Sequence, residues 1–220
     1  MGLAAAAGVS VPRRLAARRS HLTPYPPALL TGPEGAPFTS ARITPHENYI
    51  FLYPYVSTPC FLLALDGPIK PGEVPVPAEQ GSYRWAGGVG PGQAVVAYTA
   101  ICPHQWIHPE REFSMIRYYP PGQGSILVGG RDRLITCCAH GSAFDPARGG
   151  RIEQVPADLP LAAIDLEWDP STDRLTATGV RGIDIFTPFF TAFANNQRRP
   201  IEAKTPVMPL ATYSKAVIRC

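Results

Sequence analysis

The sequence lacks an apolar run that could cross a membrane as a helix. Such a helix needs about 20 consecutive apolar residues. The uncharged stretch 48–65 is interrupted by Pro54 and Pro59 and is rich in aromatic side chains. This pattern predicts two strands there, and no transmembrane helix is predicted for this sequence.

The sequence also lacks a large excess of positive or negative charge. The net charge is only +3, and no basic patch interleaved with aromatic residues is present, which argues against a nucleic-acid partner. Before the first acidic residue, Glu34, stand Arg13, Arg14, Arg18 and Arg19. Such a beginning is typical of targeting peptides, but no apolar run follows that could serve as a signal core. We expect a soluble or peripherally attached protein.

Long helices are disfavoured because the chain holds 26 prolines and 20 glycines, spread along its length. Hydrophobic residues make up 45% of its 220 residues, so a sizeable core can form. Many short strands joined by turns satisfy both observations. The composition therefore predicts an all-β fold.

Three parts are expected along the chain. Residues 1–42 are predicted to form an irregular N-terminal arm, residues 43–180 the main domain, and residues 181–220 a C-terminal extension. The extension contains an aromatic run from Phe186 to Phe193, which is more typical of a core than of a membrane anchor.

Within the main domain, two predicted elements end at cysteines. A buried strand over 93–101 leads to Cys102, and a hairpin over 125–136 leads to Cys137. A rigid sheet can hold loops at strand ends close together. Residues 66–92, crowded with proline and glycine, are expected to form a surface excursion, and residues 161–180 a further hairpin.

Two short motifs at these strand ends carry metal-ligand chemistry. They are Cys102-x-His104 and Cys137-x-x-His140, and Gly and Ser142 follow the second. Two thiolates on one iron and two imidazoles on the other form a Rieske [2Fe–2S] centre. A structural zinc site is the alternative. Zinc sites usually pair like residues within one short element, whereas each loop here supplies one sulfur and one nitrogen, which favours one [2Fe–2S] cluster per chain.

Three cysteines remain outside these motifs. Cys60, Cys138 and Cys220 are an odd number and show no framework spacing. Cys138 is interpreted as a small buried hydrophobic residue beside its ligand neighbour. The cysteine count therefore leaves the redox compartment open.

Over residues 93–180 the chain resembles the Rieske iron–sulfur proteins, in particular those of quinol-oxidising cytochrome bc-type complexes. The 32 residues between His104 and Cys137 and the hairpin around 166–173 are more similar to the archaeal terminal quinol oxidase branch. The resemblance implies a Rieske-type antiparallel β-sandwich. It also implies a small cluster-binding subdomain over about 96–156, built from the two strand-end loops.

The resemblance assigns roles residue by residue. Cys102 and Cys137 match the ligands of the buried iron, and His104 and His140 match those of the outer iron. Ser142 matches a serine whose hydroxyl donates to a bridging sulfide, which stabilises the reduced cluster and raises its potential. The alternative for Ser142 is a turn residue bonded to its own backbone.

The chain also departs from the family pattern. Phe144 stands where high-potential members have a tyrosine that donates to a ligand sulfur. Ile107 and Ala139 stand where many members have a disulfide joining the two loops. Residues 155–160 replace the usual proline loop. These changes argue against a very high potential and against a conventional bc complex.

Two other residues near the first motif have simpler interpretations. Trp106 is expected to pack in the core, and His108 is expected to lie on the surface because the ligand set is complete without it.

The function implied by the resemblance is that of an electron-transfer subunit in a respiratory membrane complex, on the outer (periplasmic or extracytoplasmic) face. His140 and His104 would contact quinol and accept its proton. The implied partners are a cytochrome b-type or other membrane subunit and a cytochrome c or copper-protein acceptor. Two alternatives stay open: a Rieske small subunit of a molybdenum oxidase, and a soluble Rieske ferredoxin-type carrier.

Overall fold

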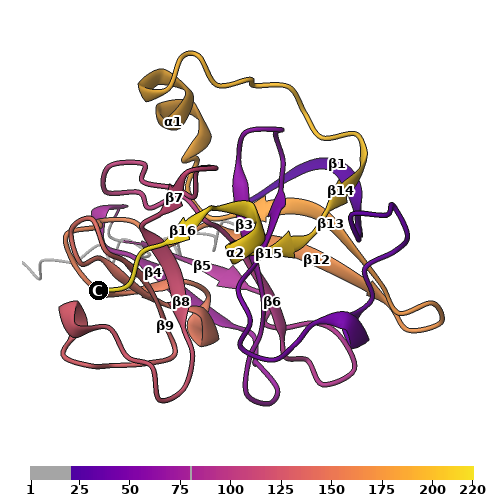
Figure 1. The fold of residues 1–220 in the computed structure, drawn as a ribbon, viewed down its shortest axis with the longest axis horizontal. Coiled ribbons are helices and arrows are strands. Elements are labelled where there is room, and N and C mark those ends of the chain that lie inside the picture. The colour runs from indigo at the N-terminus through magenta and orange to yellow at the C-terminus, as the bar shows by residue number, and fades with distance from the viewer. Residues whose placement is uncertain (1–20, 80) are drawn as a thin grey trace, which may run out of the picture.

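The computed structural model describes residues 21–79 and 81–220. The first twenty residues of the predicted N-terminal arm, with their four arginines, lie outside this range. The described chain is built mainly from strands (Figure 1), so the prediction of an all-β fold is confirmed.

The larger sheet has eight strands in the order β14-β1-β13-β12-β6-β3-β2-β15. Neighbouring strands pair antiparallel, except for β1 and β14, which are parallel. The bounds are β1 (Leu22–Thr31), β2 (Tyr49–Leu52), β3 (Pro59–Ala64), β6 (Val95–Thr99), β12 (Ala163–Asp169), β13 (Arg174–Arg181), β14 (Ala203–Pro206) and β15 (Met208–Pro209).

A second sheet has four antiparallel strands in the order β11-β10-β9-β8. Its strands are β8 (Ile116–Tyr119), β9 (Leu134–Cys137), β10 (Ala143–Asp145) and β11 (Arg151–Gln154). The remaining strands are β4 (Gly72–Val76) with β5 (Gly81–Trp85), and β7 (Phe113–Ser114) with β16 (Ala216–Val217). The helices are α1 (Phe186–Ala192), α2 (Leu210–Tyr213) and the 3₁₀ turns η1 (Ser40–Arg42), η2 (Pro77–Glu79), η3 (Ile126–Val128) and η4 (Pro146–Arg148).

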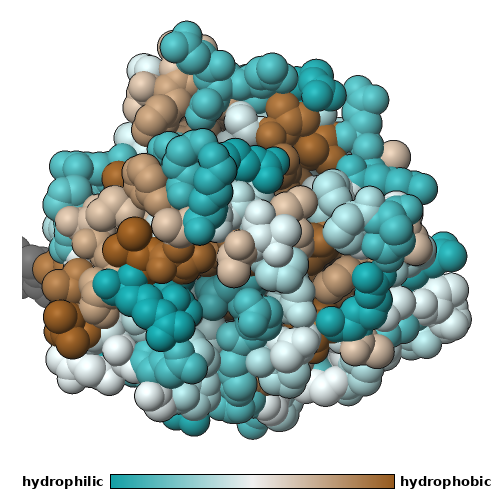
Figure 2. All heavy atoms as spheres, in the orientation of Figure 1, coloured by the Kyte–Doolittle hydropathy of each residue, from teal (hydrophilic) through white to brown (hydrophobic). Residues whose placement is uncertain are grey.

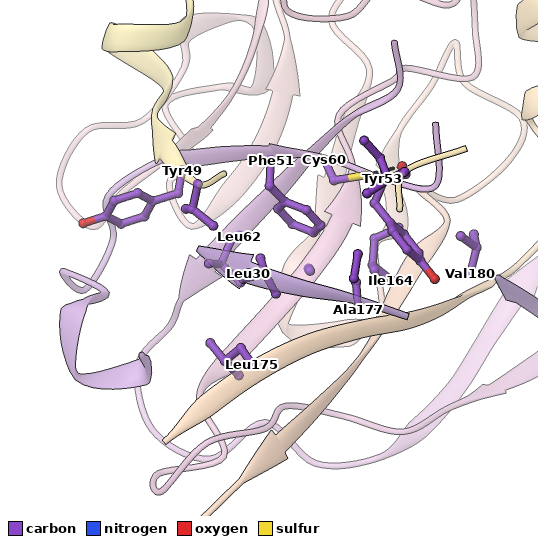
Figure 3. Packing of buried hydrophobic residues seen from close by; sticks show 14 of the residues in the cluster. Leu30, Tyr49, Phe51, Tyr53, Cys60, Leu62, Ile164, Leu175, Ala177 and Val180 are labelled. Atoms are coloured by element: carbon purple, nitrogen blue, oxygen red, sulfur yellow. Dashed lines mark hydrogen bonds between the residues drawn. The ribbon is translucent and has the colours of Figure 1, made fainter. Parts of the chain in front are cut away.

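The central strands of the larger sheet are buried on both faces. Side chains alternate along a strand, so β6 sends Val95 and Ala97 to one hydrophobic cluster and Val96 and Tyr98 to the other. The first cluster is formed by side chains from several strands of the larger sheet, and Figure 3 draws part of it. The second cluster joins the larger sheet to the four-stranded sheet and contains Cys102 and Cys137, together with Ile135 and Phe144.

Buried hydrogen bonds tie the two sheets together. The Asn48 side chain donates to Tyr118 O at 3.0 Å and accepts from the Tyr118 N–H at 2.7 Å. The Tyr98 hydroxyl donates to Pro146 O at 2.7 Å. Because these groups are shielded from water, losing a partner would leave an unsatisfied polar atom. The sheet that carries the second motif is thus held firmly against the strand that carries the first.

The structure corrects the irregular character expected for the N-terminal arm and shows where the C-terminal residues pack. Residues 22–31, expected within an irregular arm, form β1, which pairs with β13 in the larger sheet. Parts of the 181–220 extension form β14 and β15 at the two edges of that sheet. The prolines of β1 fit in this strand because its pairing with β13 shifts register between Pro24 and Ala28.

Two further expectations are corrected. The predicted hairpin over 125–136 is wrong for its first half, because residues 126–128 form η3, which ends at Gly129 in the left-handed conformation (φ 68°). β9 instead pairs with β8 and β10. The surface excursion over 66–92 contains the β4–β5 hairpin, whose Val74 and Tyr83 are buried. The strands predicted over 93–101 and the hairpin over 161–180 are confirmed.

Candidate functional site

The first motif lies on a loop that follows β6 and closes on itself. The Cys102 N–H donates to Ile107 O at 2.8 Å, and the Trp106 N–H donates to Cys102 O at 2.8 Å. Trp106 has a φ of 59°, a left-handed conformation that costs a non-glycine residue roughly 1 kcal/mol or more. Its side chain packs against the core of the larger sheet, which confirms the predicted packing role and offsets this cost.

The second motif lies on the turn between β9 and β10. The Cys137 N–H donates to Ser142 O at 2.8 Å, and the Gly141 N–H donates to Cys137 O at 2.9 Å. Gly141 has a φ of 81°, which glycine adopts readily. The turn therefore buries Cys137 at its base and leaves His140 exposed at its tip.

The two predicted sulfur ligands meet in the interior. Cys102 and Cys137 are free thiols and each is 1% exposed. A hydrogen bond to Cys137, together with burial, raises the pKa of the Cys102 thiol well above its usual range, and the same hydrogen bond lowers the pKa of Cys137. Backbone N–H groups of His104, and of Ala139 and His140, point at the two sulfurs and favour their charged forms. This environment suits thiolates bound to a cation.

The two predicted nitrogen ligands also lie together, nearer the surface. The rings of His104 and His140 stand edge to face, with centroids 4.9 Å apart and an interplanar angle of 85°. His104 is half-buried and His140 is exposed. The fold therefore brings the four residues together as a pair of sulfurs and a pair of imidazoles.

Pairs of this kind suit a two-metal cluster better than a single ion, which needs its ligands around one point. Within residues 21–79 and 81–220, no three His, Cys, Asp or Glu side chains gather in the way that one metal ion would require.

Ser142 and Phe144 line the same interior region. The Ser142 hydroxyl accepts from the Ala157 N–H at 3.0 Å, and it forms a hydrogen bond to the Cys102 sulfur that favours the thiolate. This places the hydroxyl beside a predicted ligand rather than on its own turn backbone. Phe144 is fully buried in the cluster that contains both cysteines, and its ring has no donor.

Sequence reasoning missed a disulfide at the second motif. Cys138 was interpreted as a buried hydrophobic residue, but it is bonded to Cys220, 82 residues further along the chain. The error has a physical reason, because the contact is between segments far apart in the chain. β16 pairs with β7, and the Cys138 N–H donates to Met115 O just after β7, which brings Cys138 near the end of β16. The one signal of this bond in the sequence was that Cys138 and Cys220 had no assigned ligand role. The third such cysteine, Cys60, is a buried free thiol in β3.

The expectation for His108 was also wrong. Its ring is half-buried and lies 5.2 Å from the rings of both Phe189 and Phe193 on and after α1. Its Nδ1 lies 2.7 Å from Trp106 O. The aromatic run of the C-terminal extension therefore packs on the first motif's loop, which could not be read from local spacing.

Comparison with known proteins agrees with this geometry. Residues 84–165 match the model of the Rieske [2Fe-2S] domain, and this range holds all four predicted ligands. These residues form a Rieske [2Fe–2S] domain. The fold of the chain is similar to the crystal structure of the soluble domain of Rieske protein II (soxF) from Sulfolobus acidocaldarius. That likeness has a TM-score of 0.51 at 22% identity, over 71% of this chain and 78% of the other, and it shows the fold.

A Rieske domain implies a [2Fe–2S] cluster, so the protein is an iron–sulfur electron-transfer protein. The residues present fit the cluster. Two buried thiols with backbone donors aimed at them and two adjacent imidazoles supply the mixed sulfur and nitrogen set that this centre requires.

Proposed function

We propose that Cys102 and Cys137 bind one iron of the cluster and that His104 and His140 bind the other. The buried contact between the two sulfurs and the edge-to-face contact between the two rings support this assignment. When bound, the cluster takes up and returns one electron. The N–H groups aimed at the sulfurs stabilise the negative charge that the reduced state adds.

The electron donor that we propose is a quinol, oxidised within a membrane complex. The observation that carries this proposal is a rim of apolar side chains beside the turn whose tip carries the exposed His140. Ile126 is 80% exposed, Val155 70% and Leu127 41%. Exposed apolar side chains grouped in this way mark a contact with another apolar surface.

The segments that carry the rim are bonded to the second motif. The Gln154 side chain donates to Leu127 O and to Gly141 O, each at 2.8 Å, and Val155 follows Gln154. Figure 2 shows apolar side chains at the surface on the side of the molecule where the C-terminal segment lies. We infer that this rim enters an apolar cavity of a membrane subunit, such as a cytochrome b-type protein.

The site suits the chemistry of a quinol, which releases a proton with each electron. An imidazole bound to iron by one nitrogen keeps its second nitrogen for proton exchange. His140 is exposed and can accept the proton of a quinol hydroxyl at that nitrogen. The apolar rim holds the quinol ring and excludes water from the contact.

The proposed location is the outer, extracytoplasmic face of the membrane. The Cys138–Cys220 disulfide supports an oxidising compartment, since such bonds are rare where thiols are kept reduced. In the described part of the chain, no helix is long and apolar enough to span a membrane. A cytochrome c or a copper protein is the proposed acceptor of the electron.

The rim gives a direct test of the quinol proposal. We expect Val155→Asp and Ile126→Asp to lower quinol oxidation by membranes of the source organism more than about tenfold. Burying an unpaired carboxylate costs several kcal/mol, and each 1.4 kcal/mol is a factor of ten. The cluster's electron paramagnetic resonance (EPR) spectrum should stay unchanged. The matched control is Leu22→Asp on β1, where an apolar side chain is 39% exposed away from the rim.

The outcomes separate the possible functions. Equal rates for rim and control variants would show that the rim is not a docking surface. Membranes that oxidise quinol normally after removal of this chain would contradict the quinol proposal and favour a molybdenum oxidase subunit or a soluble carrier.

Two neighbouring side chains are expected to tune the potential in opposite directions. Phe144→Tyr should raise it by adding a donor near the ligand sulfurs, and Ser142→Ala should lower it by removing one. Each change should be on the order of 0.1 V or less, because a hydrogen bond to a charged group contributes about 1.5–3 kcal/mol and one electron carries about 2.3 kcal/mol per 100 mV. Redox titration followed by EPR measures both. Unchanged potentials would contradict the proposed arrangement of these side chains.

A further inference from the structure

The disulfide joins the second ligand loop to a distant segment. Cys138 lies between Cys137 and His140, the two proposed ligands of that loop, and its partner is Cys220. The bond therefore links the second ligand loop covalently to the chain from within the motif itself.

The segment that leads to Cys220 runs along the exit of the first ligand loop. We call residues 214–220 the C-terminal strap. The Ser214 hydroxyl donates to Glu110 O at 2.6 Å. The strap's backbone N–H groups then follow in register, with Lys215 donating to Arg111 O and Ile218 to Ser114 O, each at 2.9 Å. In Figure 1 the strap, as β16, lies beside β7.

The end of the strap is held by hydrogen bonds beside the second loop. The Tyr119 hydroxyl lies 3.3 Å from each of the two disulfide sulfurs and accepts from the Cys220 N–H at 2.9 Å. The Ile126 N–H donates to Cys220 O at 3.1 Å, and the Cys138 N–H donates to Met115 O at 2.6 Å. The strap therefore contacts the exit of the first loop, the second loop and the rim.

We propose that the C-terminal strap and its Cys138–Cys220 bond position the second ligand loop relative to the first and thereby retain the cluster. The strap is hydrogen-bonded to the chain just after the first loop and covalently bonded within the second. It thus restrains, from outside the loops, the distance between the loop of Cys102 and His104 and the loop of Cys137 and His140. Cys138 and Cys220 are positioning residues, and this inference rests on the proposed ligand set but not on quinol as the donor.

The test compares Cys138→Ser and Cys220→Ser with the control Cys60→Ala, which removes a buried thiol from β3. Loss of the cluster to an iron chelator is followed by visible absorbance. We expect both strap variants to lose the cluster about tenfold faster than the wild type, with altered EPR spectra, because the restraint is covalent. Cys60→Ala should keep the wild-type rate. Mass spectrometry of unreduced peptides checks the bond itself.

A second arm separates positioning from general stability. Opening the bond in the wild type with a water-soluble phosphine, which is oxidised as the disulfide is reduced to two thiols, should reproduce the variants' faster loss. Reoxidation of protein that still holds its cluster should reverse the change. Strap variants with the wild-type loss rate and spectrum would overturn the inference, as would a lower unfolding temperature with an unchanged cluster spectrum. A wild type without any iron–sulfur spectrum would instead contradict the ligand set.

Discussion

Replacing Cys102 or Cys137 with alanine is expected to leave the protein without iron or sulfide, whereas the wild type should hold two irons and two acid-labile sulfides per chain. Each cysteine is one of two proposed sulfur ligands in a buried site. Its loss leaves one iron with a single protein ligand and leaves the backbone donors aimed at that sulfur without their acceptor. Iron and sulfide analysis measures the content, and the reduced wild type should give a rhombic EPR signal.

The matched control for this experiment is Cys60→Ala. Cys60 is also a buried free thiol, but it lies in β3 and belongs to the opposite hydrophobic cluster. Full cluster content in Cys60→Ala, with none in Cys102→Ala, would show that the effect is specific to the site. Zinc in place of iron in wild-type protein made with ample iron would contradict the cluster assignment and favour a structural zinc site.

The second large effect is expected in the pH dependence of the reduction potential. At low pH, where reduction takes up no proton, the potential should be flat. At higher pH, where reduction takes up one proton per electron, the potential should fall by about 59 mV per pH unit. Redox titration by circular dichroism at a series of pH values measures this slope.

The exposure of His140 makes this coupling possible, since a proton can pass directly to solvent or substrate. The control variant is His21→Gln, which changes a histidine beside Tyr83 at the start of β1 and should leave the curve unaltered. Phe144→Tyr should shift the curve without changing its slope, because its hydroxyl acts on sulfur. A flat potential up to about pH 9 would contradict a quinol as the donor and support a soluble carrier.

The strap adds a condition to both experiments. Strong thiol reductants are expected to reduce the Cys138–Cys220 bond. The cluster content of protein handled with them would then depend on the strap as well as on the ligands. Samples should therefore be prepared without such reductants. The comparison of ligand variants with strap variants then distinguishes absence of a ligand, which prevents binding, from loss of positioning, which accelerates release.

The two ligand loops and several strands could be predicted from local sequence patterns. Each ligand loop has a cysteine and a histidine within three or four residues. This spacing is local, so it can be recognised without knowing how the rest of the chain folds. A nearly continuous apolar run likewise predicted the buried strand over 93–101, and alternating apolar residues predicted the hairpin over 161–180, because burial on one face of a sheet has a period of two. The strand is present as β6 and the hairpin as β12 with β13.

The segments that enclose the site could not be predicted from the sequence. β1 joins the larger sheet, α1 covers His108, and Cys220 reaches Cys138 through contacts between residues that are far apart in the chain. No local pattern encodes such pairings, because their free energy comes from surfaces that meet after folding. The same holds for residues 126–128, whose apolar sequence suggests a buried strand. The fold turns them into η3 and leaves Ile126 exposed beside the second ligand loop.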